Sequence, residues 1–243
     1  MKWLLANLEQ VWELTIEHLY LSVIPIVVGL VLALVLGLVF GNRRRARTLI
    51  TTVASAVFTV PSLALFVVMP TLLGTQILDP INVVIALSLY SASLLVRTVF
   101  DALDAVPADV LNSAEAMGYS PARRRLLVDL PLALAPLAAG TRVAVVTNVS
   151  LVSVGAVIGI GGLGQLFTSG YQRNYPDQIM AGIIMILLLA LVLDRVVAVI
   201  GQLLTPWLSA KNAGDSASAV PRGAGAGLAA TQATVDPSLG GNK

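Results

Sequence analysis

The side chains that could perform covalent or metal chemistry are scarce in this chain. It contains no cysteine and a single histidine, His18, so a thiolate centre, a His/Cys metal cluster and a histidine-based catalytic triad are excluded. No G-x-x-x-x-G-K-[ST] segment is present, so the chain does not bind ATP in the P-loop manner. The residue types therefore predict a protein that is not an enzyme, with no catalytic residue, metal or cofactor of its own.

A glycine-rich segment matches the dinucleotide-binding pattern G-x-G-x-x-G through Gly159, Gly161, Gly162 and Gly164. That pattern holds a pyrophosphate only between a strand and a helix of a βαβ unit. Here it follows a long apolar segment, which is the wrong context. We interpret it either as a flexible break between a membrane span and a loop or as an outer gate, where glycines permit close packing and bending.

The polar segment Asp101–Pro131 interrupts an otherwise apolar sequence. It carries eight charged side chains, and burying each of them unpaired in lipid would cost several kcal/mol. The polar segment must therefore lie in water.

Two short helices joined near Gly118 are predicted inside the polar segment. Pro107 suits the first turn of one helix, and Gly118 can adopt the left-handed conformation that ends it. Ser120 and Pro121 then provide the N-cap and first residue of a second helix, which Pro131 is expected to terminate. A simple linker would not need such definition, whereas a docking element would.

The composition places the rest of the chain in a membrane. Of the 243 residues, 57% are hydrophobic and 12% charged, and the mean hydropathy is +0.88; a soluble domain has about 25% charged residues. Five apolar segments are each long enough to cross a hydrocarbon core, at residues 19–40, 49–73, 81–99, 132–158 and 179–204. We therefore predict an all-α integral membrane protein with five transmembrane helices over 19–208, an amphipathic interfacial helix over 1–18 and a disordered tail over 209–243.

Basic residues determine the predicted orientation, because cytoplasmic loops are enriched in them. With five spans, the arginines at 43–47, those of the polar segment and the basic residues of the tail all lie on one side, while the other side has only Lys2 and Arg173. The sequence therefore predicts an outside N-terminus, a cytoplasmic C-terminus and an outer loop over 159–176, in a multi-pass protein of the bacterial plasma membrane.

Uncharged polar side chains cluster inside the predicted spans. Hydroxyl and amide groups of this kind commonly join helices by hydrogen bonds. They could also line a path for a solute that needs weak, replaceable contacts, and a path without buried charge suits a neutral or zwitterionic solute. The candidate residues of this translocation path are Pro61, Ser62, Tyr90, Ser91, Asn148 and Ser153.

Two charged side chains in the last spans have two interpretations. Arg142 can extend its long side chain to the cytoplasmic interface and act as an anchor. Alternatively, it pairs with Asp194 between the fourth and fifth spans. The sequence leaves both interpretations open.

The polar segment resembles the cytoplasmic EAA loop of permease subunits in bacterial ATP-binding-cassette importers. The pattern of that loop is E-A-A, three residues, G, nine residues, I-x-L-P. Here it reads Asn112-Ser113-Ala114, then Gly118, then Val128-Asp129-Leu130-Pro131, so the spacing is kept while Asn112 replaces the glutamate. The stretches 58–68, 103–121 and 152–171 are similar to permeases of osmoprotectant importers, the glycine betaine, carnitine and choline group.

This resemblance implies a type I importer permease fold, with the polar segment as the cytoplasmic coupling loop. It implies a complex of cytoplasmic ABC ATPase subunits that bind ATP and Mg, a second permease subunit, the same or homologous, and an extracytoplasmic solute-binding protein, with no nucleic acid. A permease for methionine or another small nutrient is the alternative, and a secondary transporter without an ATPase is a further one. The residues implied in ATPase docking are Asn112, Ser113, Ala114, Glu115, Met117, Gly118, Tyr119, Arg123 and Pro131.

Overall fold

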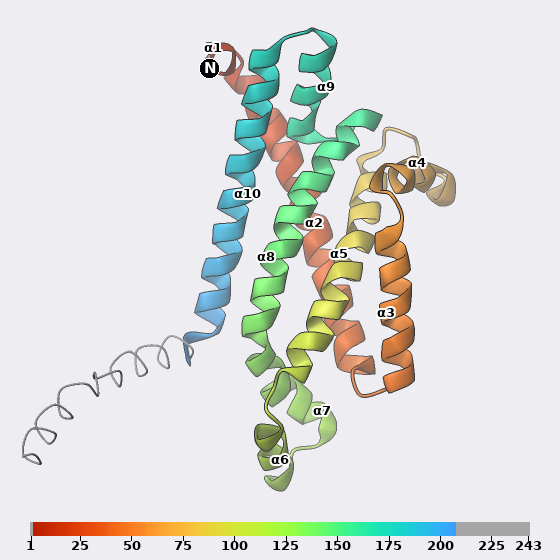
Figure 1. Cartoon of the computed structure of the whole chain (residues 1–243), viewed down its shortest axis with the longest axis vertical. Helices are drawn as coiled ribbons and strands as arrows, with labels where there is room; N and C mark the ends of the chain where they lie inside the picture. The colour runs from red at the N-terminus through yellow and green to blue at the C-terminus, as the bar shows by residue number, and fades with distance from the viewer. Residues whose placement is uncertain (1, 208–243) are drawn as a thin grey trace, which may run out of the picture. The chain divides into compact units, whose positions relative to one another are not determined.

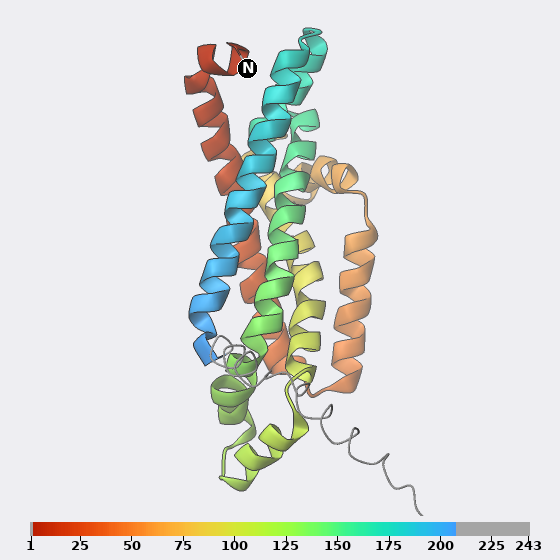
Figure 2. The same cartoon turned by 60° about the vertical axis from the view of Figure 1, so that its left-hand side comes forward.

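The computed structural model describes residues 2–207, and the regular structure in this range is entirely helical. Five helices run along a common axis: α2 (Leu8–Phe40), α3 (Arg44–Thr59), α5 (Pro80–Asp104), α8 (Leu130–Gly155) and α10 (Pro176–Leu204) (Figures 1 and 2). α4 (Ser62–Leu73) lies across this axis. One end of the bundle carries α1 (Lys2–Ala6) and α9 (Gln165–Gln172), and the other carries α6 (Ala108–Ala116) and α7 (Pro121–Arg124). The compact unit ends at Thr205, and the predicted tail over 209–243 lies outside the described residues.

The long helices have the length and composition of membrane spans. α2, α5, the run Pro121–Ile158 that contains α8, and α10 each qualify alone, whereas α3 and α4 qualify only as a pair bent by 102°. Only 6% of the most apolar window of α10 is buried, so this helix presents apolar side chains outward, as lipid contact requires. The five predicted spans thus correspond to four long helices and one bent pair.

The bend between α3 and α4 corrects the prediction of one continuous span over 49–73. A residue before proline is pushed out of the α region, and Val60 is extended, with φ −63° and ψ 131°. The hydroxyl of Tyr90 on α5 donates a hydrogen bond to the Val60 carbonyl, which the end of α3 leaves without a helical partner. Pro61 therefore turns the chain sideways from α3 into α4, and the fifth candidate span is this bent pair instead of one straight helix.

The first span also differs from its predicted boundary at residue 18. α2 is one helix of 33 residues, or about 50 Å, so no separate helix over 1–18 exists. Val11, Leu14 and His18 on its first half are buried. They are covered by the glycine-rich segment and the start of α9, including Leu163 and Leu166. An amphipathic pattern in residues 1–18 cannot reveal this burial, because the residues that cover the helix lie about 145 positions later in the sequence.

Small residues bring the central helices close together. On α2, Gly29, Ala33 and Gly37 are all buried and recur every four residues. A Cβ atom on Gly29 would lie 2.5 Å from the Cβ of Ser91 on α5, and one on Gly37 would lie 2.3 Å from Val99 Cγ1. Membrane helices gain dispersion energy by such close approach. The α2–α5 contact is therefore a fixed part of the bundle.

Candidate functional site

The helical loop at the cytoplasmic end is closed by a left-handed glycine, as the sequence predicts. Gly118 has φ +84°. Its N–H bonds to the carbonyl of Glu115 at 2.9 Å, and the N–H of Tyr119 bonds to the carbonyl of Ala114 at 3.2 Å. These two hydrogen bonds form a Schellman motif at the end of α6. α7 then begins at Pro121 with Ser120 as its N-cap residue.

Most of the residues implied in ATPase docking lie on α6, on the turn after it and on α7, where they form a largely exposed surface, while Pro131 lies apart from them on α8. Met117 is 71% exposed at the tip, where an apolar side chain gains by finding a partner. Ala114 is the exception, because it is buried and supports the turn from inside. The guanidinium of Arg123 lies 5.6 Å from the ring centre of the half-buried Tyr119. The exposed members are Asn112, Ser113, Glu115, Met117, Gly118 and Arg123.

Polar contacts hold the helices of this loop together and attach the loop to the bundle. Glu115 of α6 pairs with Arg124, whose Nε lies 3.4 Å from a carboxylate oxygen of Asp129. Arg125 donates a hydrogen bond to the carbonyl of Leu38 near the end of α2. The three arginines therefore have different contacts: Arg123 faces outward, Arg124 joins α6 to η1 within the polar segment, and Arg125 attaches this segment to α2.

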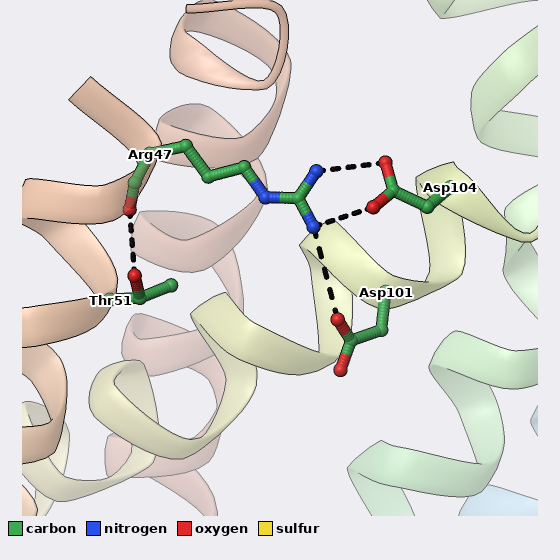
Figure 3. A network of polar contacts seen from close by, with 4 residues as sticks. All are labelled: Arg47, Thr51, Asp101 and Asp104. Atoms are coloured by element: carbon green, nitrogen blue, oxygen red, sulfur yellow. Dashed lines mark hydrogen bonds and ion pairs between the residues drawn. The ribbon is translucent and has the colours of Figure 1, made fainter. Parts of the chain in front are cut away.

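A second connection, which sequence analysis missed, joins α3 to the base of the loop. Arg47 of α3 reaches both carboxylate oxygens of Asp104, at 2.8 and 2.6 Å, and lies 3.9 Å from Asp101 (Figure 3). Its guanidinium also lies 4.9 Å from the ring centre of Phe100. The sequence counts Arg47 only as one of several basic residues that mark the cytoplasmic side. A bidentate pair fixes direction as well as distance, so α3 and the end of α5 are held together.

Pro131 does not end the second helix, contrary to the sequence prediction. α7 continues through a single π-turn, η1 (Arg125–Asp129), into α8, and Pro131 is the second residue of α8. Within η1 the N–H of Leu130 bonds to the carbonyl of Arg125, five residues back. A proline lacks an N–H and clashes with the carbonyl four residues before it. The wider π-turn accommodates both defects at the point where the α-helical pattern resumes.

The predicted path residues are mostly enclosed at contacts between helices. Tyr90, Ser91 and Asn148 are buried. Asn148 Nδ2 donates to the carbonyl of Ser22 on α2 at 2.9 Å, which is the joining role that the sequence left open. Pro61 is exposed and Ser62 partly exposed at the α3–α4 bend, and Ser153 lies beside the glycine-rich segment. The path along these six residues stays a prediction.

The glycine-rich segment is a tightly packed turn. Gly159 and Gly162 have positive φ, +91° and +47°, which supports the glycine requirement. A Cβ on Gly162 would lie 2.6 Å from the backbone of His18, and one on Gly164 would lie 2.6 Å from the Ser153 carbonyl oxygen. One on Gly161 would lie 2.2 Å from the Ala156 nitrogen. The turn therefore fixes α8 against the first half of α2, and its role as an outer gate stays a prediction.

The pair between the last two spans is present. Arg142 Nε and Nη2 donate to the two carboxylate oxygens of Asp194, both at 2.7 Å. This bidentate geometry confirms the second interpretation of Arg142 and joins α8 to α10.

Arg142→Ala and Asp194→Ala should therefore act on one interaction. Each single variant is expected to lower the thermal stability of the purified permease, because it leaves the other charge unpaired at membrane depth. The double variant should lose less than the sum of the two single losses. Arg45→Ala, at an exposed position away from α8 and α10, is the control. Strictly additive losses would show that the two side chains do not interact.

The fold is that of an all-helical integral membrane protein with an exposed helical loop at one end of the bundle. The family described as "Binding-protein-dependent transport system inner membrane component" matches residues 26–209, and this chain belongs to that family. It is 32% identical over 207 residues to the osmoprotectant import permease protein OsmW of Salmonella typhimurium, covering 84% of this chain and 96% of that protein. It is 30% identical over 192 residues to the choline transport system permease protein OpuBB of Bacillus subtilis, covering 79% and 87%.

A solved structure of the MetNI methionine ABC transporter, facing inward, contains a chain of the same fold. The TM-score is 0.67 at 23% identity, over 84% of this chain and 98% of the other. The chain is therefore a permease subunit of the type I ABC importer fold, a multi-pass protein of the bacterial plasma membrane. Within residues 2–207, no group of three or more His, Asp or Glu side chains is placed to hold a metal ion.

Proposed function

We propose that this permease imports a compatible solute such as glycine betaine, choline or carnitine, powered by ATP on partner subunits. The observation that carries the proposal is the exposed helical loop around Gly118, together with the names of the relatives that match nearly the whole chain. The partners are two cytoplasmic ABC ATPase subunits that hold ATP and Mg, a second permease subunit, the same or homologous, and an extracytoplasmic solute-binding protein.

In the proposed mechanism, the docking surface on α6 follows the ATPases when they close. Met117 fills a groove of the ATPase, where full burial of such a side chain contributes about 1.5–3 kcal/mol. The motion passes to the spans through two connections. One is the continuous run from α7 through η1 into α8, and the other is the pair between Arg47 and Asp104. Because both run directly into membrane helices, a displacement of the loop tilts those helices and alternates access to the path.

Methionine import is the alternative that the fold raises. The MetNI structure shares the fold at 23% identity, whereas the osmoprotectant and choline permeases share 30–32% identity over most of the chain. The sequence relationship therefore favours a compatible solute. A secondary transporter would need no docking surface on α6 and would leave Met117 without a partner.

The test is uptake by the complete complex, purified with its ATPase and binding protein and reconstituted in vesicles. Radiolabelled glycine betaine, choline and carnitine are supplied, each with unlabelled methionine as competitor. We expect ATP-dependent uptake of at least one of the three, and no competition by methionine. Uptake of methionine instead, or uptake that follows an ion gradient without ATP hydrolysis, would overturn the proposal.

A further inference from the structure

One face of α3 is unusually polar for a helix at membrane depth. Thr48, Thr52, Ser55 and Thr59 follow one another at intervals of four, three and four residues, so they lie on one face, and all four are exposed. Thr48 and Thr59 donate back to carbonyls of their own helix, which leaves their oxygens able to accept further hydrogen bonds.

Two grooves flank α3, and their linings are chemically different. The apolar groove, of about 320 Å³, is lined by residues such as Leu49, Val53 and Val57. The polar groove, of about 290 Å³, lies between α3 and α5 and is lined by Thr51, Ser55, Phe58, Thr59, Ser93 and Arg97, among others. Its size is close to the lower limit of small-molecule sites, about 300 Å³. The two grooves share Ala54 and Ser93, but hydroxyl groups and Arg97 are otherwise found only in the lining of the polar groove.

The polar groove carries one cation. Arg97 lies on α5, seven residues before its end at Asp104, which is about 10 Å along the helix. The side chain is exposed, and within residues 2–207 no carboxylate forms an ion pair with it. A guanidinium at this depth is costly unless it is paired, and its planar donors fit a carboxylate in bidentate fashion.

The same groove carries an aromatic ring. Phe58 is 46% exposed and packs edge-on against Tyr90, with ring centres 6.0 Å apart at 82°. Tyr90 is itself fixed by its hydrogen bond to the Val60 carbonyl, so the Phe58 ring has a defined position. Aromatic rings attract quaternary ammonium groups through the negative charge of their faces. The groove thus contains a guanidinium that can pair with a carboxylate, an aromatic ring that can contact a trimethylammonium group, and several hydroxyl groups.

We propose that the polar groove between α3 and α5 is a transient binding site for a zwitterionic solute during passage. Arg97 binds the carboxylate, Phe58 contacts the quaternary ammonium group, and Ser55, Thr59 and Ser93 supply exchangeable hydrogen bonds. The proposal rests on the proposed function for the class of solute. It places the contacts on the exposed face of α3, whereas Tyr90, Ser91 and Asn148 of the sequence-predicted path are buried. We expect weak binding, because an open groove leaves the solute partly hydrated.

The absence of cysteine from the chain permits a direct test by thiol labelling. Ser55→Cys and the matched control Val53→Cys, both exposed on α3 but on different grooves, are introduced separately into the complete reconstituted complex. A water-soluble methanethiosulfonate reagent should label Ser55→Cys much faster than Val53→Cys, and glycine betaine should slow the labelling of Ser55→Cys. Equal labelling at the two positions, or no effect of glycine betaine at Ser55→Cys, would overturn the proposal.

Arg97→Gln in the Ser55→Cys background tests the carboxylate contact. The concentration of glycine betaine that gives half-protection should rise at least about tenfold, because a charge-assisted hydrogen bond is lost. Protection by choline, which has no carboxylate, should change much less. Arg195→Gln, another arginine at membrane depth but on α10, is the matched control and should leave protection unchanged. Equal weakening for both solutes would show that Arg97 has only a structural role.

Two further outcomes separate the competing explanations. If phosphatidylglycerol in the vesicles protects Ser55→Cys and glycine betaine does not, Arg97 binds a lipid headgroup and the proposal is wrong. If the wild-type complex transports glycine betaine but the solute never protects Ser55→Cys, the polar groove is not the binding site, while the proposed function stands. If the wild-type complex neither transports nor is protected by any of the three compatible solutes, the proposed function fails as well.

Discussion

Replacing Gly118 by proline is expected to abolish ATP-driven uptake while leaving the permease inserted in the membrane. Proline fixes φ near −65°, whereas Gly118 has φ +84° and donates its N–H to the Glu115 carbonyl at 2.9 Å. The substitution therefore removes the Schellman motif that ends α6. The apolar spans that direct insertion are untouched. Uptake in vesicles and co-purification of the ATPase are the measurements.

Gly74 offers a closely matched control for this experiment. Gly74 also has positive φ, +68°, and also closes a helix, although its N–H donates to the Pro70 carbonyl four residues back, whereas that of Gly118 donates three residues back. A Cβ on either glycine would meet no atom within 4 Å. Gly74 lies at the opposite end of the bundle, after α4. Gly74→Pro should keep the ATPase attached, whatever its effect on uptake. Normal co-purification and full uptake in Gly118→Pro would contradict the docking role of the loop.

Gly162→Ala should be among the most destabilising single-methyl substitutions in the chain. The added Cβ would lie 2.6–2.7 Å from three atoms of His18, its backbone nitrogen, its Cα and its Cβ. The φ of +47° is also strained for alanine. Strain costs about 1–2 kcal/mol and overpacking a further 1–3 kcal/mol. Because the obstacle is α2 itself, neither side can move without separating α2 from the turn. Thermal unfolding of the purified protein, followed by the loss of monodisperse material, measures the effect.

Gly159→Ala separates strain from packing. Gly159 has φ +91°, but a Cβ there meets only the end of the Leu78 side chain, at 3.1 Å. This variant should therefore lose only the strain component, about 1–2 kcal/mol. If Gly159→Ala and Gly162→Ala are equally destabilised, the contact between the turn and His18 contributes nothing to stability.

Features determined by neighbouring residues could be predicted from the sequence. The left-handed Gly118 and the restart of the helix at Ser120 and Pro121 depend on the backbone preferences of those residues alone. The apolar lengths of the spans and the exposure of the polar segment follow from the incompatibility of charge with lipid. These elements agree with the structure because no distant contact is needed to specify them.

Features that depend on a distant partner could not be predicted. The sequence predicts one span over residues 49–73, whereas the chain bends at Pro61, where the Val60 carbonyl accepts a hydrogen bond from the hydroxyl of Tyr90, thirty residues away. His18 reads as an interfacial residue and is fully buried because Gly162 packs on its backbone. The amide of Asn148 could equally face a path or a helix, and only the position of the Ser22 carbonyl decides. Arg47 carried no signal beyond its charge.

The π-turn η1 has a consequence for how the docking surface is aimed. An α-helix rotates about 100° per residue, so an additional residue in α-helical geometry changes the angular phase of everything that precedes it, whereas a π-turn takes up that residue within one wider turn. Arg125–Asp129 hold such a residue between α7 and α8. Deleting that residue would therefore restore an uninterrupted α-helix with little change in the direction of α7, whereas a residue added in α-helical geometry would swing Gly118 and Met117 about 100° around the axis of α8. The width of this turn thus preserves the direction in which the loop points.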